Sequence, residues 1–269
     1  TNSSGSAIEF SSNSTITNPT GTAFNIANVQ DTAVSFGGAI VQNNASTAVR
    51  VDGFTDSVVS FLGQVTANTG TATGIDLTNN MGSTIVFGAG LDIDTTTGTG
   101  FNATGGGTVN VGSPTIVSTI DTSNGQALNL DGINMGITFT SISSTNSPME
   151  GIDIDNVMGT FALTDGDDDN DTIDILMING TGATFAGIDI ANSPTATFTF
   201  ANVDISNTGA HGVHLNNAGT ALFSARSPAV GDEIGTTFIN STNGDGFNIT
   251  NTNTLVFDIN SKVCLIFFF

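Results

Sequence analysis

The sequence is short of cations, and this absence limits its partners. Its 269 residues include three Lys and Arg against 24 Asp and Glu, so the formal net charge is −21 at pH 7. The three cations, Arg50, Arg226 and Lys262, are far apart in the sequence. Because nucleic acids and anionic membranes are bound through clustered Lys and Arg, this composition argues against both partners.

Cysteines and long apolar runs are scarce too. Cys264 is the only cysteine, which excludes an internal disulfide framework. No apolar run reaches the roughly 18 residues of a membrane helix, so we expect no membrane insertion. No Gly-x-Ser-x-Gly, Walker or dinucleotide motif stands in a strand-to-helix context. The chain begins at Thr1 without Met or a signal sequence, which favours a mature product or a piece of a longer protein.

What the sequence does contain is a short repeated unit. Its clearest copy is Gly-Ile-Asp-Ile-Asp-Asn at residues 151–156, and most copies lie between 24 and 27 residues apart. A period of this size predicts a solenoid. The ten copies begin at Ala7, Ala23, Ala48, Gly74, Gly100, Ala127, Gly151, Gly187, Gly212 and Gly246.

Each position of the repeat has its own chemical character. The first residue is Gly or Ala, the second and fourth are apolar, and the third is polar. This alternation predicts a strand with one buried face and one wet face. The sixth residue is Asn or Gly in every copy except at Ser12; both accept a left-handed backbone, so each strand should end in a sharp bend. The asparagines of this structural column are Asn28, Asn79, Asn156, Asn192, Asn217 and Asn251.

A strand, a bend and a return after about 25 residues describe a coil of three short strands. We therefore predict an all-β fold, a right-handed parallel β-helix of about ten coils over residues 1–260 as a single domain. Residues 261–269 fit no column of the repeat and form a non-repeat tail, a candidate cap for the last coil.

Phenylalanines and threonines give two further expectations. Phe36, Phe61, Phe87 and Phe200 each lie 13 residues after the start of a repeat, which predicts one ladder of stacked rings inside the solenoid. Threonine pairs such as those at residues 71–73 and 195–197 suggest an ice-binding array. They share no offset from the repeat, so no regular threonine array is expected.

Two spacings are about ten residues too long, and the extra residues should form extruded loops near 165–175 and 226–235. The first loop is acidic and offers hard oxygen ligands for Ca²⁺. The alternative is a solvated acidic bulge, and the spacing matches no standard calcium loop. If calcium binds, its expected ligands are Asp165, Asp167, Asp169 and Asp171.

Residues 91–111, LDIDTTTGTGFNATGGGTVNV, resemble a segment that recurs in very large secreted and surface proteins of bacteria with right-handed parallel β-helix repeats. The asparagine column also resembles the asparagine ladder of pectate-lyase-like β-helices. The resemblance covers residues 7–260 and implies a secreted or cell-surface location. It implies a non-enzymatic module, a stalk, adhesin or self-assembling fibre subunit, with end-to-end stacked copies or cell-surface glycans as partners.

The same resemblance implies an alternative, a carbohydrate-active β-helix of the polysaccharide lyase or glycoside hydrolase kind, or a glycan-binding module. Related polygalacturonases carry a His-Gly signature and an Arg-x-Lys motif; here His211-Gly212 matches in part and Arg-x-Lys is absent. We therefore predict no catalytic residues. Asp153 and Asp155 are interpreted as part of a solvated face. His211 and His214 are interpreted as exposed polar residues, although half of a metal site is an alternative.

Overall fold

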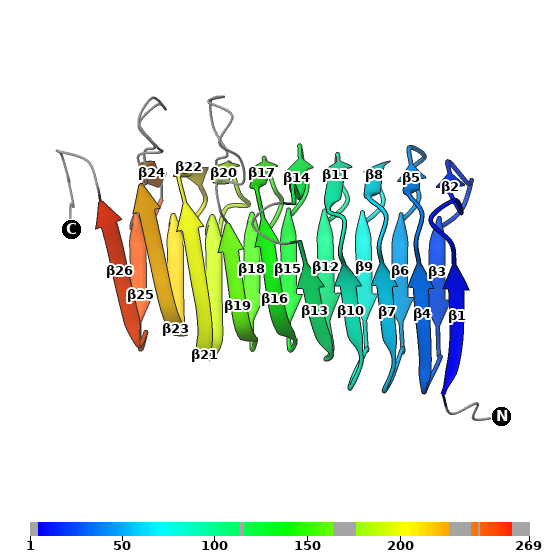
Figure 1. The fold of residues 1–269 in the computed structure, drawn as a ribbon. Helices are drawn as coiled ribbons and strands as arrows, with labels where there is room; N and C mark the ends of the chain where they lie inside the picture. Colours follow the sequence, from blue (N-terminus) through cyan, green and yellow to red (C-terminus); the bar gives the residue numbers. More distant parts are fainter. Residues whose placement is uncertain (1–4, 113–115, 164–175, 226–237, 242, 260–269) are drawn as a thin grey trace, which may run out of the picture.

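The computed structural model describes residues 5–112, 116–163, 176–225, 238–241 and 243–259. These residues form an all-β parallel solenoid of about eight turns (Figure 1). Successive strands stack in parallel along one axis, as the repeat predicts. No helix in this part of the chain is long and apolar enough to cross a membrane.

Each coil contributes one strand to each of three faces. The anchor face holds the repeated unit, and its strands are β3 (Phe24–Ala27), β6 (Val49–Asp52), β9 (Ile75–Thr78), β12 (Phe101–Thr104), β15 (Leu128–Asp131), β18 (Ile152–Asp155), the first part of β21 (Ile188–Ala201), the first part of β23 (Val213–Ala225) and β25 (Phe247–Thr250). The second face holds β1 (Ser6–Phe10), β4 (Thr32–Phe36), β7 (Val58–Phe61), β10 (Thr84–Phe87), β13 (Thr108–Val111), β16 (Asn134–Phe139), β19 (Met158–Leu163), the last parts of β21 and β23, and β26 (Thr254–Ile259).

The third face is a separate nine-stranded sheet. Its strands are β2 (Ile16–Thr17), β5 (Ile40–Gln42), β8 (Val65–Gly70), β11 (Leu91–Thr95), β14 (Thr119–Thr122), β17 (Ser141–Thr145), β20 (Leu176–Asn179), β22 (Val203–Thr208) and β24 (Phe238–Ser241). The anchor face and the second face are joined because β21 and β23 run through the bend between them without a break.

The repeat alignment is confirmed for nine of the ten copies. Their second residues stand in one column from Phe24 to Phe247, with parallel pairing between every neighbouring pair of strands. The copy at Ala7 is wrong, because β1 pairs with β4 and Ala7 faces Ala33 on the second face. This accounts for Ser12 at the sixth position and for a lower number of turns than the ten predicted coils.

The inward residues of the anchor strands form the core, as expected, except at the ends of the stack. From β6 to the first part of β23 they are all buried. Ile249 in β25 is 38% exposed, and Ile8 and Phe10, which were expected in an anchor strand but lie in β1 of the second face, are 48% and 43% exposed. Within the described chain β1 pairs with β4 alone and β25 with β23 alone, so these side chains have a neighbouring coil on one side only.

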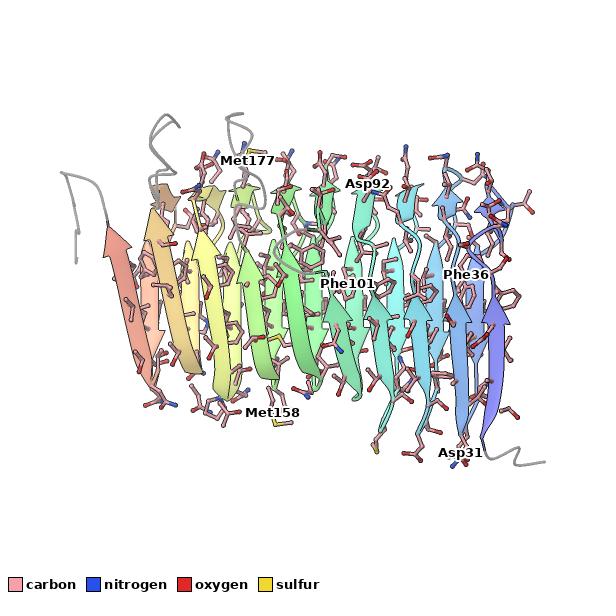
Figure 2. The ribbon with its side chains drawn as sticks, in the orientation of Figure 1. Asp31, Phe36, Asp92, Phe101, Met158 and Met177 are labelled. Atoms are coloured by element: carbon pink, nitrogen blue, oxygen red, sulfur yellow. The ribbon has the colours of Figure 1, made fainter. Side chains whose placement is uncertain are left out.

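The phenylalanine ladder exists as two columns, not one. Phe36, Phe61 and Phe87 face one another in register, and the rings of Phe61 and Phe87 stack with centroids 4.9 Å apart. Phe200 belongs to a second column, where it stacks on Phe223 at 5.1 Å. The reason is the bend after the anchor strand, which shortens along the stack, so equal offsets do not mean equal register. Figure 2 shows Phe36 inside the solenoid, between the strands.

The predicted left-handed bend is confirmed in all nine remaining copies. The sixth residue has φ between 47° and 78°, whether it is Asn or Gly. The small first residue also has a physical cause. A Cβ added at Gly100 would lie 2.6 Å from Ile120 Cγ2 and 2.7 Å from the Ala127 carbonyl oxygen, so the chain turns against the next coil with no room for a side chain.

Candidate functional site: the outward stripe of the anchor face

The calcium ligands expected from the sequence, Asp165, Asp167, Asp169 and Asp171, lie outside the described residues. The insertion at 226–235 and the tail at 261–269 lie outside them as well. The strands on either side of the acidic insertion, β19 and β20, keep their places in the stack. Among the residues with described positions, no group of three or more His, Cys, Asp or Glu side chains could hold a metal ion.

The described chain does contain a continuous polar stripe on the outside of the anchor face. It consists of the third residue of each copy, and the strand register places these side chains one above another along the whole stack. We call it the anchor stripe. Its members are Asn25, Arg50, Asp76, Asn102, Asn129, Asp153, Asp189, His214 and Asn248.

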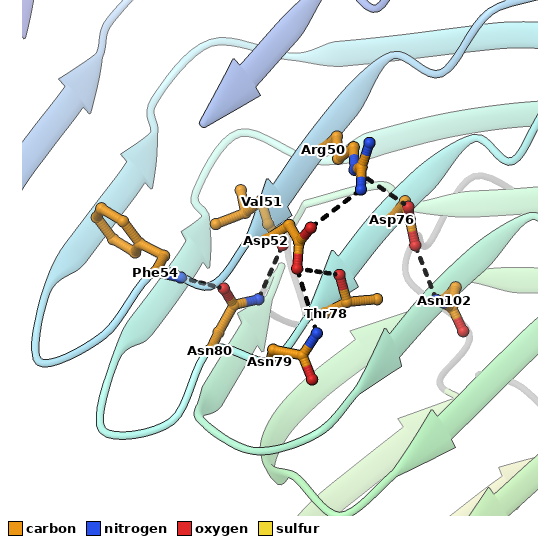
Figure 3. Close-up of polar contacts among 9 residues, drawn as sticks. All are labelled: Arg50, Val51, Asp52, Phe54, Asp76, Thr78, Asn79, Asn80 and Asn102. Atoms are coloured by element: carbon orange, nitrogen blue, oxygen red, sulfur yellow. Dashed lines mark hydrogen bonds and ion pairs between the residues drawn. The ribbon is translucent and has the colours of Figure 1, made fainter. Parts of the chain in front are cut away.

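From Arg50 to Asn129, each side chain of the anchor stripe contacts its neighbour in the next coil, and Figure 3 shows the part from Arg50 to Asn102. Arg50 contacts Asp52 at 3.0 Å and Asp76 at 3.8 Å. The Asn102 Nδ2 donates to Asp76 Oδ1 at 2.8 Å, and the Asn129 Nδ2 donates to Asn102 Oδ1 at 2.8 Å. These residues form a rung-to-rung chain, with their polar atoms directed at one another along the axis.

The bend asparagines extend this network to the neighbouring column. The Asn79 Nδ2 donates to Asp52 Oδ1 at 3.2 Å, and the Thr78 hydroxyl donates to the same oxygen at 2.9 Å. These bonds, with the charge of Arg50, lower the pKa of Asp52. Asn192 donates to Asp155 in the same way at 2.9 Å. These two asparagines therefore bond to carboxylates, and glycines at several sixth positions interrupt any continuous asparagine ladder.

The middle of the anchor stripe is acidic and partly buried, which the interpretation as a solvated face did not anticipate. Burial raises the pKa of Asp153 to about 7, and the charges of Glu150, Asp189, Asp155 and Asp131 act in the same direction. Burial and the charge of Asp189 also raise the pKa of Glu150. A carboxyl that titrates near neutral pH can both donate and accept a proton, as acid–base chemistry requires.

The two histidines follow at the C-terminal end of the stripe. His214 Nδ1 lies 3.0 Å from Asp189 Oδ1, and the rings of His211 and His214 stack with centroids 5.8 Å apart. His211 Nδ1 accepts the backbone N–H of Asp245 at 3.1 Å, and His211 Nε2 lies 3.0 Å from the side-chain nitrogen of Asn248. Both side chains are 28% exposed and hydrogen-bonded, so they are more buried and better paired than the exposed polar residues that we expected.

Two parts of this network were missed from the sequence. Glu150 lies in the bend before an anchor strand and belongs to no column, although an acidic residue next to Gly151 could have been noticed. Asn80 follows the bend and is buried at 2% exposure. Its side chain accepts the Phe54 N–H and donates to the Val51 carbonyl, both at 3.0 Å (Figure 3). Asn80 therefore serves the backbone of the preceding bend and not the outer surface.

Comparisons of the chain with protein-family models, with curated proteins and with solved structures give no match. The assignment of the fold as a parallel β-solenoid therefore rests on the strand register alone.

Proposed function

We propose that the chain is a structural or adhesive module of an extracellular protein, acting as a stalk, an adhesin or a self-assembling fibre subunit. The observation that supports this proposal is the direction of the bonds in the anchor stripe. Arg50, Asp76 and Asn102 use their polar atoms on one another, from coil to coil. Side chains paired along the axis reinforce a rod, whereas catalysis needs groups that converge on one space beside a substrate.

The ends of the described stack present edges to which a further coil could pair, from another copy or from more of the same chain. β1 and β25 are terminal strands of the described solenoid, and edge strands offer unpaired backbone groups to another chain. Ile8, Phe10 and Ile249 leave apolar surface exposed there. End-to-end stacking would cover it. The secreted or cell-surface location rests on the resemblance of residues 91–111 to bacterial surface repeats.

Negative-stain images at rising protein concentration test the proposal. A stalk should give single short rods at every concentration, and a fibre subunit should give rods that lengthen as concentration rises. Turnover of a polysaccharide by the purified chain, lost on substitution of the anchor stripe, would contradict a non-enzymatic module.

Asp153 supports one alternative, a carbohydrate-active or glycan-binding β-helix. Its pKa of about 7 and its position next to Asp189 in the register bring an acid–base group beside a second carboxyl. The net charge of −21 repels polyuronates, so neutral glycans are the expected ligands. Glycan binding or cleavage that Asp153→Asn and Asp189→Asn abolish would favour this alternative. Asp204→Asn, on the third face, is the control.

A further inference from the structure

The second face has an outer surface without a charged side chain from β4 to β23. Inward and outward residues alternate along these strands, and the register aligns the outward ones in columns. We call this surface the neutral face. Its residues are Ala33, Ser35, Val58, Ser60, Thr84, Val86, Thr108, Asn110, Asn134, Gly136, Thr138, Met158, Thr160, Ala162, Thr197, Thr199, Thr220 and Leu222.

The other two faces carry charges along the same length. The outward charged residues of the anchor face are Arg50, Asp52, Asp76, Asp131, Asp153, Asp155 and Asp189. Those of the third face are Asp92, Asp94, Asp121 and Asp204. The acidic residues nearest to the neutral face, Asp31 and Asp56, lie in the bends before β4 and β7, and Figure 2 shows Asp31 at the rim. Glu9 on β1 is an outward charge of the second face outside this span; from β4 to β23 the charge lies on the other two faces and the bends.

Threonine is the commonest residue of the neutral face, and part of it is regular. Thr160, Thr197 and Thr220 stand in one column on adjacent strands, followed by Thr254 on β26. The column holds Ser60, Val86, Asn110 and Gly136 on the preceding strands, so the threonines do not form a regular array along the whole stack. Val58 and Met158 add exposed apolar area, at 44% and 58% exposure. Threonine methyls, valines and a methionine on straight stacked strands make a surface that can interdigitate with another sheet.

We propose that the neutral face binds the neutral face of a second copy of this chain. A basic partner would be drawn to the aspartates of the other faces. An acidic partner other than this chain would lack side-chain rows with the spacing of this face. A second copy brings the same strand spacing of about 4.8 Å, so the side-chain rows of both surfaces stay in step along the interface. It also keeps the carboxylates of the two chains on outer surfaces, away from the contact.

The area is sufficient for a reversible dimer. Eight strands at about 4.8 Å spacing span about 38 Å, and about five residues per strand at about 3.3 Å give a width of about 16 Å. The face therefore covers roughly 600 Å² per copy and roughly 1,200 Å² for the pair, at the lower limit of standard interfaces. Because both copies use the same surface, the contact is isologous and closes at two chains.

Analytical ultracentrifugation of the full chain over a concentration series tests the proposal. The wild type should show a reversible monomer–dimer equilibrium that strengthens as NaCl rises, because salt screens the repulsion between two highly acidic chains. The test variant is Val86→Glu with Thr160→Glu. Val86 and Thr160 stand in one column, on the third strand from either end of the face, so a two-fold axis that runs along the strands through the middle of the face places them opposite each other. The variant should dimerise at least about tenfold more weakly, because like charges would meet.

The matched control is Thr66→Glu with Ser141→Glu, which adds the same charge to outward positions of the third face. It should dimerise like the wild type. A Val86→Lys, Thr160→Lys variant should be monomeric alone and should form a mixed dimer with the Glu variant, which shows that both chains fold and meet through this face. Three results would overturn the proposal. The wild type could stay monomeric at millimolar concentration, or the control and test variants could weaken dimerisation equally. Association could also continue beyond two chains and be unaffected by either pair of substitutions.

Discussion

Asp153→Asn should change how the stability of the solenoid depends on pH. In the folded chain the pKa of Asp153 is about 7, against 3.8 for an ordinary Asp. The folded state therefore holds the proton more tightly than the unfolded state, and stability falls as pH rises from about 4 to about 7. At about 1.4 kcal/mol per pH unit, the full difference is about 4 kcal/mol. Because Asp153 is partly exposed, solvent screening reduces this to about 1–2 kcal/mol.

Thermal unfolding followed by circular dichroism between pH 4 and pH 8 measures this effect. An asparagine side chain cannot ionise, so the Asp153→Asn variant should unfold a few degrees above the wild type at pH 8 and close to it at pH 4. Asp204→Asn on the third face removes one carboxyl elsewhere and is the control; its profile should follow the wild type. If Asp153→Asn leaves the difference in melting temperature between pH 4 and pH 8 unchanged, the ionised form of Asp153 does not destabilise the folded chain, and this prediction is wrong.

Four further predictions concern the core, the bends, the acidic insertion and the tail. Ile154→Asp should destabilise the chain by several kcal/mol, because Ile154 is fully buried, whereas Ser141→Asp at an outward position of the third face should have little effect on the melting temperature. Asn156→Val should cost about 1–3 kcal/mol in chemical denaturation, since φ is 53° there, and Asn156→Gly should be nearly neutral. Calcium should raise the melting temperature, Asp169→Asn should blunt the rise, and calorimetry without saturable uptake at millimolar calcium would exclude the site. Deletion of residues 261–269 should promote end-to-end association in light scattering; an unchanged molecular mass would contradict a capping role.

The anchor face could be predicted because its signals are local. Alternation of apolar and polar residues determines which side of a strand is buried, and Asn or Gly at the sixth position marks a left-handed bend. Both signals lie within six residues, so they survive insertions elsewhere in the coil. Ile152 and Ile154 are buried and Asn156 has a positive φ, as the pattern requires, although an insertion follows in the same coil.

The other faces were harder to align because bend lengths vary. The inner column of the second face is reached 13 residues after Ala23, at Phe36, but nine residues after Gly212, at Ala221. An offset from the anchor therefore does not measure register, and Phe200 was placed in the wrong column. Ala7 was misassigned for a related reason. A second-face strand alternates apolar and polar residues like an anchor strand. Only its sixth residue, which is Ser12 and not Asn or Gly, distinguishes it.

The acidic centre of the anchor stripe could have been read from the sequence in part. Asp153 and Asp189 are the third residues of consecutive copies, so their adjacency follows from the alignment. The burial of Asp153 and the charge of Glu150 that acts on it do not follow, because Glu150 comes from the bend before the strand and belongs to no column. The environment of a side chain on a solenoid depends on the coils above and below it, and bends of unequal length change that environment without changing the repeat.

The neutral face is informative because folding does not require it. Outward side chains of a β-solenoid contact the same column in adjacent coils and do not enter the core, as shown by the aspartates that the anchor face and the third face tolerate. Thr108 and Thr160 point outward from their strands, as Asp76 and Asp121 do on the other faces. A carboxylate there would point away from the core and, unlike Asp153, would have no carboxylate beside it in the register, so it would be tolerated and would reduce the risk that an exposed sheet associates. Its absence over eight strands of a chain with a charge of −21 is therefore better explained by contact with another surface than by the needs of the fold.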